Sequence, residues 1–458
     1  MDALLLSRIQ FAFTVGYHFI FVPMSIGLAI MVVASERRYY KSDIPSDKSA
    51  SKFWIRLFTT TFAIGVATGI TMEFAFGTNW ADYSRFVGNI FGAPLAAEGL
   101  FAFFLESVFL GILLFGRDRV SKRLYYVSTW LVMIGALLSA LWILIANSWQ
   151  QTPAGYKIED GKAMLTSFWA AALNPSIAQR YTHTIAGCII AGAFVVAAIS
   201  AWYLLKGRHV RMARHALRTG LIVGLIVSAV MPLIGHWSAL EVAKYQPVKM
   251  AAFENVYETG DRAPLYLFGW VHTNAEGEPT TTGISIPDGL SLMLGLNPEH
   301  IVTGLDSVPA ADRPPAQITF QSYHLMIALS FLFILVMLIA AVMLALKRIE
   351  KARWVLWLLV VCSPLPIIAI FLGWAAAEVG RQPWVVQGLL RTSDGVSPLV
   401  TAGQVWTTLG IFALIYLVLF IGWARVFFGT IARGPEEVAD MLTAEKTAAV
   451  AAPSGAGR

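Results

Sequence analysis

The feature that most constrains the fold is an apolar run that recurs along the chain and is each time long enough to cross a bilayer. A transmembrane helix needs about 20 predominantly apolar residues. We count nine such runs, at residues 9–35, 54–76, 94–116, 124–146, 181–205, 219–241, 318–346, 354–377 and 402–428. Only 14% of the 458 residues are charged, against about 25% in a soluble protein. The sequence therefore predicts an all-α, polytopic membrane protein with nine transmembrane helices.

The basic residues predict how these helices are oriented. Most of the 34 Lys and Arg residues lie in the loops after the first, third, fifth and seventh runs and in the C-terminal tail. Loops rich in Lys and Arg stay in the cytoplasm, so we expect the N-terminus outside and the C-terminus in the cytoplasm. The net charge of +6 follows from this topology, and we expect no nucleic-acid partner. The first run is too long for a signal peptide, so we keep it as a span.

The spans divide the chain into four parts. Residues 1–241 hold the first six spans, residues 318–430 hold the last three, and residues 431–458 form an Ala-rich cytoplasmic tail that we expect to be disordered. The loop at 242–317 lies outside by this topology and is too long for a simple connection. We expect it to cover or build a binding site, with a purely structural cap as the alternative.

Several ionisable side chains fall inside the runs, where a charge is costly and a functional role is the default hypothesis. At 1.5 Å per residue, His18 lies about 14 Å below the outer surface, Glu98 about 6 Å and Glu106 about 18 Å. The other candidates also lie in the outer half of the membrane: His183, His236, His324, Met326 and Glu378. His and Met are common axial ligands of haem iron. The group therefore fits a metal or haem site with a proton path, although each residue alone could be structural.

Two classes of haem protein fail on the number of histidines. A four-helix dihaem cytochrome b needs two histidines on one helix, whereas the first and fifth spans carry one each. A haem–copper oxidase needs more intramembrane histidines than the four present, which are His18, His183, His236 and His324. The sequence has no C-x-x-C-H motif for covalent haem attachment.

Five motifs, taken in order, resemble one family of membrane oxidases. They are "FTVGYHFIFVP" around His18, "TMEFAFGTNW" at 71–80, "AAEGLFAFFLES" around Glu98 and Glu106, "QPVKMAAFENVYET" at 246–259 and "GRQPW" at 380–384. Together they resemble the large subunit (subunit I) of cytochrome bd-type ubiquinol or menaquinol oxidases. The resemblance covers essentially the whole chain, and it is to the members with a short Q-loop, which is here the loop at 242–317.

The resemblance implies which residues bind haem. It implies that His183 and Met326 are the axial ligands of a low-spin haem b. His18 and Glu378 match the ligands of a high-spin haem b and of haem d, and which of the two holds haem d stays open. A third haem b in place of haem d also stays open. Some members carry Arg two residues before the axial Met, where this chain has His324.

The same resemblance implies roles for the remaining candidates. It implies that Glu98 and Glu106 are the acids at the haem d side and in the proton path. Arg381 and Trp374 match residues that support the haem cluster. Lys249 and Glu254 match the pair that binds quinol in the Q-loop.

The function implied is that of a terminal respiratory oxidase subunit in the bacterial cytoplasmic (inner) membrane. It would oxidise quinol and reduce O₂ to water, and it would build a membrane potential without pumping because the protons consumed come from the cytoplasm. The resemblance implies a second membrane subunit as partner, in surrounding lipid, and leaves a small single-span subunit open. The alternative from the residues alone is a proton- or ion-coupled transporter, which would be colourless and would commonly contain an inverted repeat.

Overall fold

The computed structural model describes residues 2–274 and 278–436. Within these residues nine helical segments are long and apolar enough to cross a membrane, as predicted. Seven of them are unbroken: α1 (Ala3–Ser42), α2 (Pro45–Thr78), α5 (Lys122–Gln151), α7 (Ile177–Lys206), α8 (Val210–Tyr245), α11 (Ala316–Ala345) and α15 (Ala402–Arg433). They extend past the apolar runs because helical hydrogen bonding continues into the polar flanks, where end caps satisfy the free amides. At the start of α1, for example, Asp2 accepts the amide of Leu5 at 2.7 Å.

The third and eighth segments are interrupted. The third consists of α3 (Ala81–Ala97), a π-helical stretch at Glu98–Phe103 and α4 (Phe104–Phe115). It begins well before the predicted start at residue 94, and its π-helical stretch opens on Glu98, a type of irregularity that often marks functional sites. The eighth consists of α12 (Arg353–Cys362) and α13 (Leu365–Val379). Pro364 stands at this break, where its missing N–H interrupts the helical hydrogen bonds.

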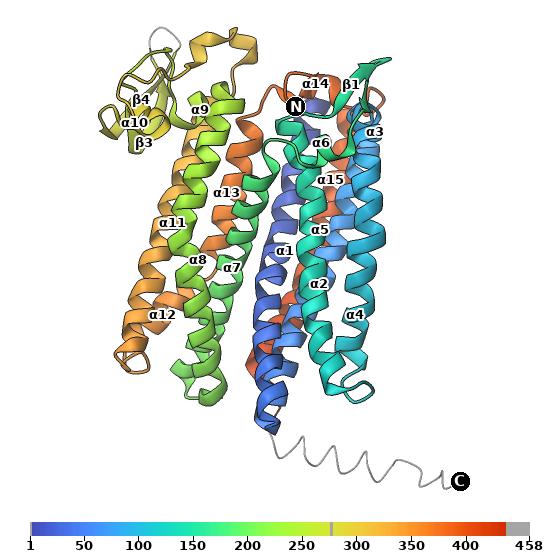
Figure 1. The fold of residues 1–458 in the computed structure, drawn as a ribbon. Coiled ribbons are helices and arrows are strands. Elements are labelled where there is room, and N and C mark those ends of the chain that lie inside the picture. The colour runs from blue at the N-terminus through green and yellow to red at the C-terminus, as the bar shows by residue number, and fades with distance from the viewer. Residues whose placement is uncertain (1, 275–277, 437–458) are drawn as a thin grey trace.

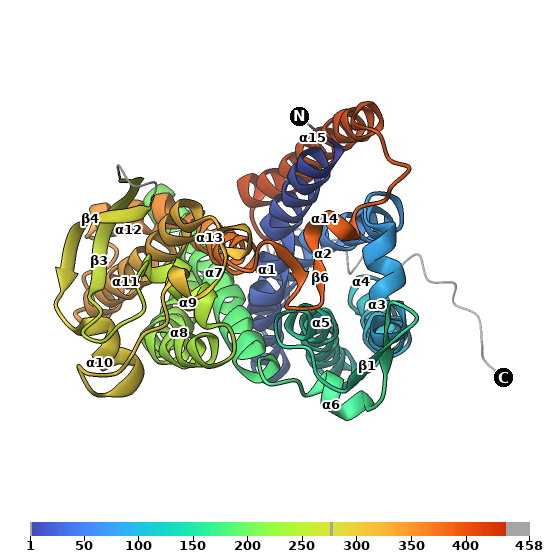
Figure 2. The same cartoon turned by 90° about the horizontal axis from the view of Figure 1, so that it is seen from above.

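Helices α1 and α7 form the centre of the bundle. Figure 2 shows α8, α11, α12 and α13 on one side of them and α2, α3, α4 and α5 on the other. The two central helices approach closely where Gly27 faces Gly192. A Cβ on Gly27 would lie only 2.6 Å from the Cα of Gly192, so a larger residue would not fit there. Small residues at such contacts let membrane helices pack backbone to backbone. The remaining helices therefore hold their functional side chains around a tightly packed pair.

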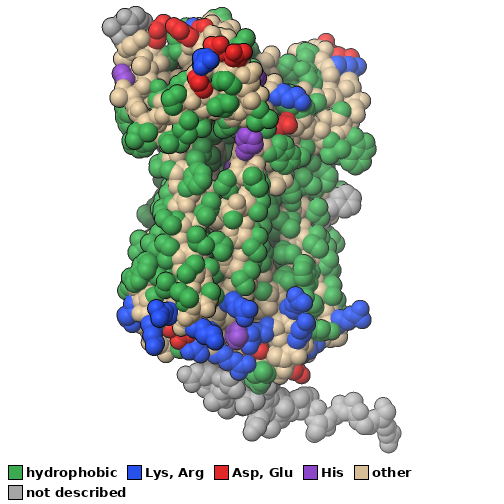
Figure 3. Space-filling model, turned by 60° about the vertical axis from the view of Figure 1, so that its left-hand side comes forward, with side chains coloured by type: hydrophobic (Ala, Val, Ile, Leu, Met, Phe, Trp, Pro, Cys, Tyr) green, Lys and Arg blue, Asp and Glu red, His purple; other side chains and the backbone are tan. Residues whose placement is uncertain are grey.

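The short elements gather at one end of the bundle (Figure 1). They are the helices α6 (Phe168–Ala172), α9 (Pro247–Glu254), α10 (Gly289–Gly295) and α14 (Thr392–Gly395), the 3₁₀ turns Leu305–Ser307 and Ala310–Asp312, and the strands β1 (Tyr156–Glu159), β2 (Lys162–Leu165), β3 (Leu265–Thr273), β4 (Pro279–Ile286), β5 (Trp384–Val386) and β6 (Leu390–Arg391). The strands pair as three antiparallel hairpins, β1–β2, β3–β4 and β5–β6. Figure 3 shows basic side chains gathered at the opposite end and hydrophobic ones between. The basic loops and the short elements thus lie at opposite ends of the bundle.

Each predicted span overlaps one helical segment, although α2, α3 and α8 begin well before the predicted starts. The Q-loop, predicted at 242–317, lies between α8, which ends at Tyr245, and α11, which begins at Ala316. It contains the short elements from α9 to the second 3₁₀ turn. Helix α15 continues to Arg433, so the last span extends slightly past the predicted start of the tail at residue 431. Most of the predicted disordered tail, residues 437–458, lies outside the described residues.

Candidate functional site

A buried polar network surrounds Glu378 at the end of α13. One carboxylate oxygen accepts hydrogen bonds from Asn147 at 3.0 Å and from Gln151 at 3.1 Å, both on α5. The other oxygen pairs with Arg381, whose side chain is only 5% exposed. Arg381 in turn donates to Gln150 at 3.2 Å. Three donors thus hold a carboxylate at the junction of α5 and α13, where an unpaired charge would be costly.

Lys249 joins the same network from the first turns of the Q-loop. Its ammonium group is buried and donates to Gln151 and, at 2.8 Å, to Gln246. Gln151 therefore contacts both Lys249 and Glu378. Burial lowers the pKa of Lys249 well below its ordinary value, and neighbouring guanidinium groups add to the effect. Each of these two bonds is donated by an N–H of Lys249 to a side-chain amide oxygen.

Glu254, also on α9, points to a different helix. Its carboxylate lies 3.5 Å from Nε2 of His324 on α11. The two ring nitrogens of His324 lie 3.0 Å from the carbonyl oxygens of Phe320 and Tyr266. A carbonyl only accepts hydrogen bonds, so a doubly protonated ring would satisfy both contacts, and Glu254 would then be its counter-charge.

His18 is oriented by a hydroxyl group on α2. Its Nδ1 lies 2.8 Å from Oγ1 of Thr68. The Thr68 hydroxyl has one proton, and it is directed at the carbonyls of Ile64 and Gly65, each at 2.9 Å. Thr68 must therefore accept from His18, so the proton sits on Nδ1. The Nε2 lone pair is then available to a metal, as in the second-shell arrangements that orient metal-binding histidines.

Met326 on α11 and His183 on α7 are the two proposed ligands of one haem. Met326 packs against the backbone of α13, because a Cβ on Gly373 would come within 2.6 Å of its sulfur. Nδ1 of His183 is buried without a hydrogen-bond partner among the described residues, and so are Nε of Arg180 and Nε of Arg381. Buried polar atoms are rarely left unpaired. An imidazole without a partner near the Arg180 guanidinium, with Arg381 next to Arg180, fits an iron-bearing cofactor with acidic substituents.

The acids of the third segment form a row with one residue from α2. Glu98 accepts a hydrogen bond from Ser139 on α5 at 2.8 Å, and Glu106 is buried. Glu98 interacts electrostatically with Glu106 and with Glu73 on α2. The structure therefore brings three carboxyl groups together, of which the sequence analysis singled out two.

Of the other two candidates, Trp374 packs against aromatic rings inside the protein, whereas His236 lies on the surface. Trp374 lies between α13 and α1, with ring centroids 6.4 Å from Phe11, 6.1 Å from Phe19 and 5.8 Å from Phe371. Phe19 neighbours His18, so Trp374 packs beside that part of α1. His236 is exposed on the surface of α8 and does not join the buried group. An apolar run alone could not tell which face of a helix points to lipid.

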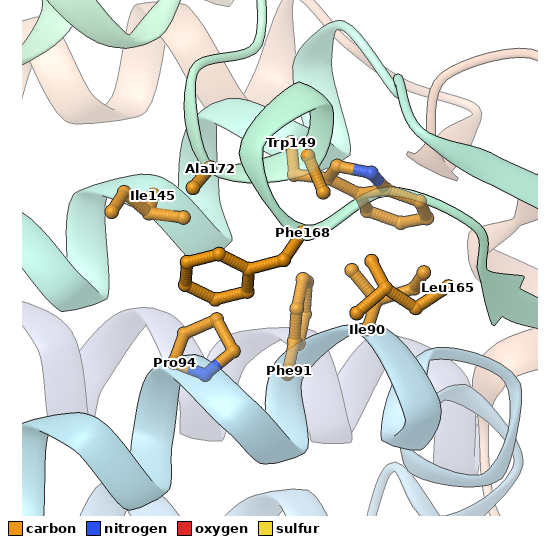
Figure 4. A pocket seen from close by; sticks show the side chains of 9 residues that line it. Ile90, Phe91, Pro94, Ile145, Trp149, Leu165, Phe168 and Ala172 are labelled. Atoms are coloured by element: carbon orange, nitrogen blue, oxygen red, sulfur yellow. The ribbon is translucent and has the colours of Figure 1, made fainter.

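A small gap between α3, α5 and α6 offers no competing site (Figure 4). Its volume of about 10 Å³ holds at most one water. The lining is apolar throughout: Ile90, Phe91, Pro94, Ile145, Trp149, Leu165, Phe168, Ala171 and Ala172. This gap therefore offers no polar contact to a substrate.

Comparison with known proteins gives a consistent result. The family model for cytochrome bd terminal oxidase subunit I matches residues 6–435. The chain belongs to this family. Cytochrome bd ubiquinol oxidase subunit 1 of Bacillus subtilis (strain 168) is 39% identical, covering 95% of each chain. Cytochrome bd-II ubiquinol oxidase subunit 1 of Escherichia coli (strain K12) is 36% identical, covering 91% of this chain and 94% of that one.

The fold agrees with a solved member of the cytochrome bd family. The structure of bd oxidase from Geobacillus thermodenitrificans superimposes with a TM-score of 0.85 at 32% identity and covers 95% of this chain and 99% of the other. The protein is thus a multi-pass membrane subunit of a terminal oxidase, which decides against the transporter alternative. Membership of the cytochrome bd family also implies bound haem and partner subunits.

Several polar residues of the site were missed from the sequence: Thr68, Glu73, Asn147, Gln150, Gln151 and Arg180. Two of these residues, Glu73 and Arg180, could have been singled out from the sequence. Glu73 is an ionisable residue inside a predicted span. Arg180 stands one helical turn before His183 and so shares its face. The amide side chains of Asn147, Gln150 and Gln151 follow a long apolar run, so in the sequence they look like an ordinary helix end. Only their contacts with α9 and α13 identify them as part of the site.

Proposed function

We propose that this chain takes electrons from quinol at its outer end and passes them to haems that reduce O₂ to water. One observation carries the proposal. Gln151 hydrogen-bonds both Lys249, the candidate quinol residue, and Glu378, the candidate haem ligand. A buried hydrogen-bond network that joins the proposed quinol site to the proposed haem site suits coupled electron and proton transfer.

The candidate ligands fit two kinds of haem site. His183 and Met326 are the proposed axial ligands of a low-spin haem b, with Arg180 and Arg381 available to its acidic substituents. His18 and Glu378 are the proposed ligands of a high-spin haem b and a haem d, or a third haem b. When bound, the haems supply electron transfer and the reduction of O₂. The protein's part is to orient the ligands, and Thr68 does so for His18.

Proton movements follow from the positions of the remaining groups. Lys249 and the carboxylate of Glu254 are proposed to accept the protons that quinol releases. Glu106 and Glu98 are proposed to pass protons inward from the cytoplasmic side, with Glu73 as a third carboxyl in the row. Protons released outside and taken up from inside would build a membrane potential without a pump.

We further propose that the chain works in the bacterial inner membrane with a second membrane subunit, with a small single-span subunit as a further component. The relatives from B. subtilis and E. coli carry ubiquinol in their names, and either ubiquinol or menaquinol would suit the Q-loop chemistry described. Oxygen uptake driven by each quinol tests the choice.

Replacing Lys249 by Gln tests the quinol site. The amide cannot accept a proton as an amine does, so we expect a KM for quinol about tenfold higher, equivalent to about 1.4 kcal/mol, with haem content unchanged. Steady-state oxygen uptake by the purified oxidase complex measures it. Lys244→Gln, at the exposed end of α8, is the matched control and should leave KM unaltered. An unchanged KM in Lys249→Gln would remove Lys249 from the site.

Replacing Thr68 by Val tests the orientation of His18. Valine keeps the shape and removes the acceptor for Nδ1, so we expect the spectrum and midpoint potential of one high-spin haem to shift while the low-spin haem b stays as it was. Thr68→Ser should restore the parent values. Thr61→Val is the control, because Thr61 is also buried on α2 but contacts Trp423. Identical high-spin spectra in Thr68→Val and the parent would contradict the role of Thr68.

A further inference from the structure

The hairpin β3–β4 of the Q-loop has two unlike faces. On one face Gly269 and Val271 are buried, Gly269 lies against Phe320 of α11, and the Gly269 carbonyl accepts from Gln321 at 3.1 Å. On the other face Phe268 is 73% exposed, Trp270 61% and Ile284 66%, and Phe268 stands directly opposite Ile284 in the strand register. Large apolar side chains clustered on an exposed surface mark a contact with something apolar.

The hairpin lies beside a membrane helix instead of above it. Gln321 contacts Gly269, and Nε2 of His324 lies 3.0 Å from the Tyr266 carbonyl. His324 is eight residues after the first residue of α11, which is about 12 Å along the helix axis. Figure 1 shows β3 and β4 alongside the outer end of α11. The exposed face of the hairpin is therefore level with the first turns of a membrane-length helix.

The exposed side chains of the hairpin change from apolar to polar along its length, and the apolar end is the one nearer the membrane. Tyr266 contacts the deeper residue of α11, and Gly269, further along β3, contacts the shallower one, so the strands rise away from the bilayer. The large exposed residues at the deep end are apolar: Leu267, Phe268, Ile284 and Ile286. Those at the far end are polar: His272, Thr273, Thr280 and Thr282. An apolar base and a polar tip are what the interface of a bilayer requires.

The apolar face also continues onto the side of the helix. Ile318 and Leu325 of α11 are exposed next to the residues that hold the hairpin. Figure 3 shows hydrophobic side chains on the bundle and on the lower part of the outer layer, with most acidic side chains of that layer nearer its top. The exposed apolar residues of α11 and of the hairpin thus lie close to one another.

We propose that the face of β3–β4 that carries Phe268, Trp270 and Ile284 lies in the lipid leaflet at that end of the protein. Its rings and methyl groups sit at the boundary between headgroups and acyl chains, where aromatic side chains are favoured. The opposite face holds His324 beside Glu254, so the leaflet fixes the depth of this part of the Q-loop. The inference needs only a membrane subunit, and it stands apart from the proposed quinol chemistry.

Site-directed fluorescence in vesicles tests this placement. The oxidase complex, labelled at Phe268→Cys or Thr280→Cys, is reconstituted in phosphatidylcholine vesicles that contain a lipid with a nitroxide high on its acyl chain. We expect the label at 268 to be quenched several-fold more by this lipid than the label at 280. Iodide in the water should give the reverse order. Cys188 and Cys362 are buried, and the unlabelled parent treated with the dye sets the background.

A second labelled site guards against effects of one substitution. Ile284→Cys faces Phe268 across the hairpin and should give the same quenching pattern. Strong iodide quenching at 268 and 284, with none from the lipid, would mean that the face is in water and would overturn the proposal. Protection from both quenchers would also overturn it, because another protein subunit would then cover the face.

Discussion

The Met326→Leu variant is expected to lose the low-spin character of one haem b. Leucine has the volume of methionine but no sulfur, so the iron opposite His183 would lack its second axial ligand. The reduced-minus-oxidised spectrum should lose the sharp band of a low-spin haem b, and the remaining high-spin signal should increase. Quinol-driven oxygen uptake should fall to near background, because we propose that electrons from quinol enter through this haem.

The matched control for Met326→Leu is Met343→Leu, which makes the same change further along α11. It should keep the parent spectrum and the parent rate. Gly373→Ala supplies a second test, because the added methyl group would meet the Met326 sulfur and should disturb the same band. A parent-like spectrum in Met326→Leu would refute Met326 as a ligand.

The Glu106→Gln variant is expected to stop turnover while leaving the low-spin haem assembled. Glutamine keeps the size of the buried side chain and cannot carry a proton, so uptake from the cytoplasmic side is blocked. A positioned proton-transfer group contributes about 10²–10⁴-fold, and the loss in oxygen uptake should fall in that range. Single-turnover reduction by quinol should stay fast, because it does not require proton uptake through Glu106.

Glu350→Gln is the control for this variant. Glu350 pairs with Arg214 at the exposed basic end of the bundle, with one contact at 2.8 Å. Its loss should cost little in stability or rate, because exposed ion pairs contribute about 0–1 kcal/mol. Fast oxygen reduction by Glu106→Gln would show that protons reach the haems by another route.

The sequence was most informative about features that depend on the hydrophobicity of a whole segment. The cost of unpaired backbone groups in lipid dictates helices, so nine spans could be counted and the Q-loop bounded within a few residues. The same reasoning missed the break into α3 and α4, because a π-helical stretch at Glu98 depends on packing against α5. It also treated His236 as part of the buried group, since helix rotation is decided by neighbours.

The site was predicted in part, and the division has a physical reason. Ionisable residues in apolar runs stand out, so His18, His183, Glu106 and Glu378 were found from the residues and the resemblance together. Gln151 and Thr68 did not stand out, because an amide or hydroxyl near a helix end is ordinary until a partner is known. The sequence did not indicate what His324 contacts. The structure places its two ring nitrogens next to the carbonyl oxygens of Phe320 and Tyr266.

The central claim is that quinol electrons reach O₂ through haems held by this chain. The most direct measurement is an anaerobic spectrum of the purified complex, first with quinol and then with an oxygen pulse. The account predicts that quinol produces the bands of reduced haem b and that oxygen removes them within one turnover, with Met326→Leu failing at the first step. A colourless protein, or haem bands that quinol does not reduce, would contradict the account.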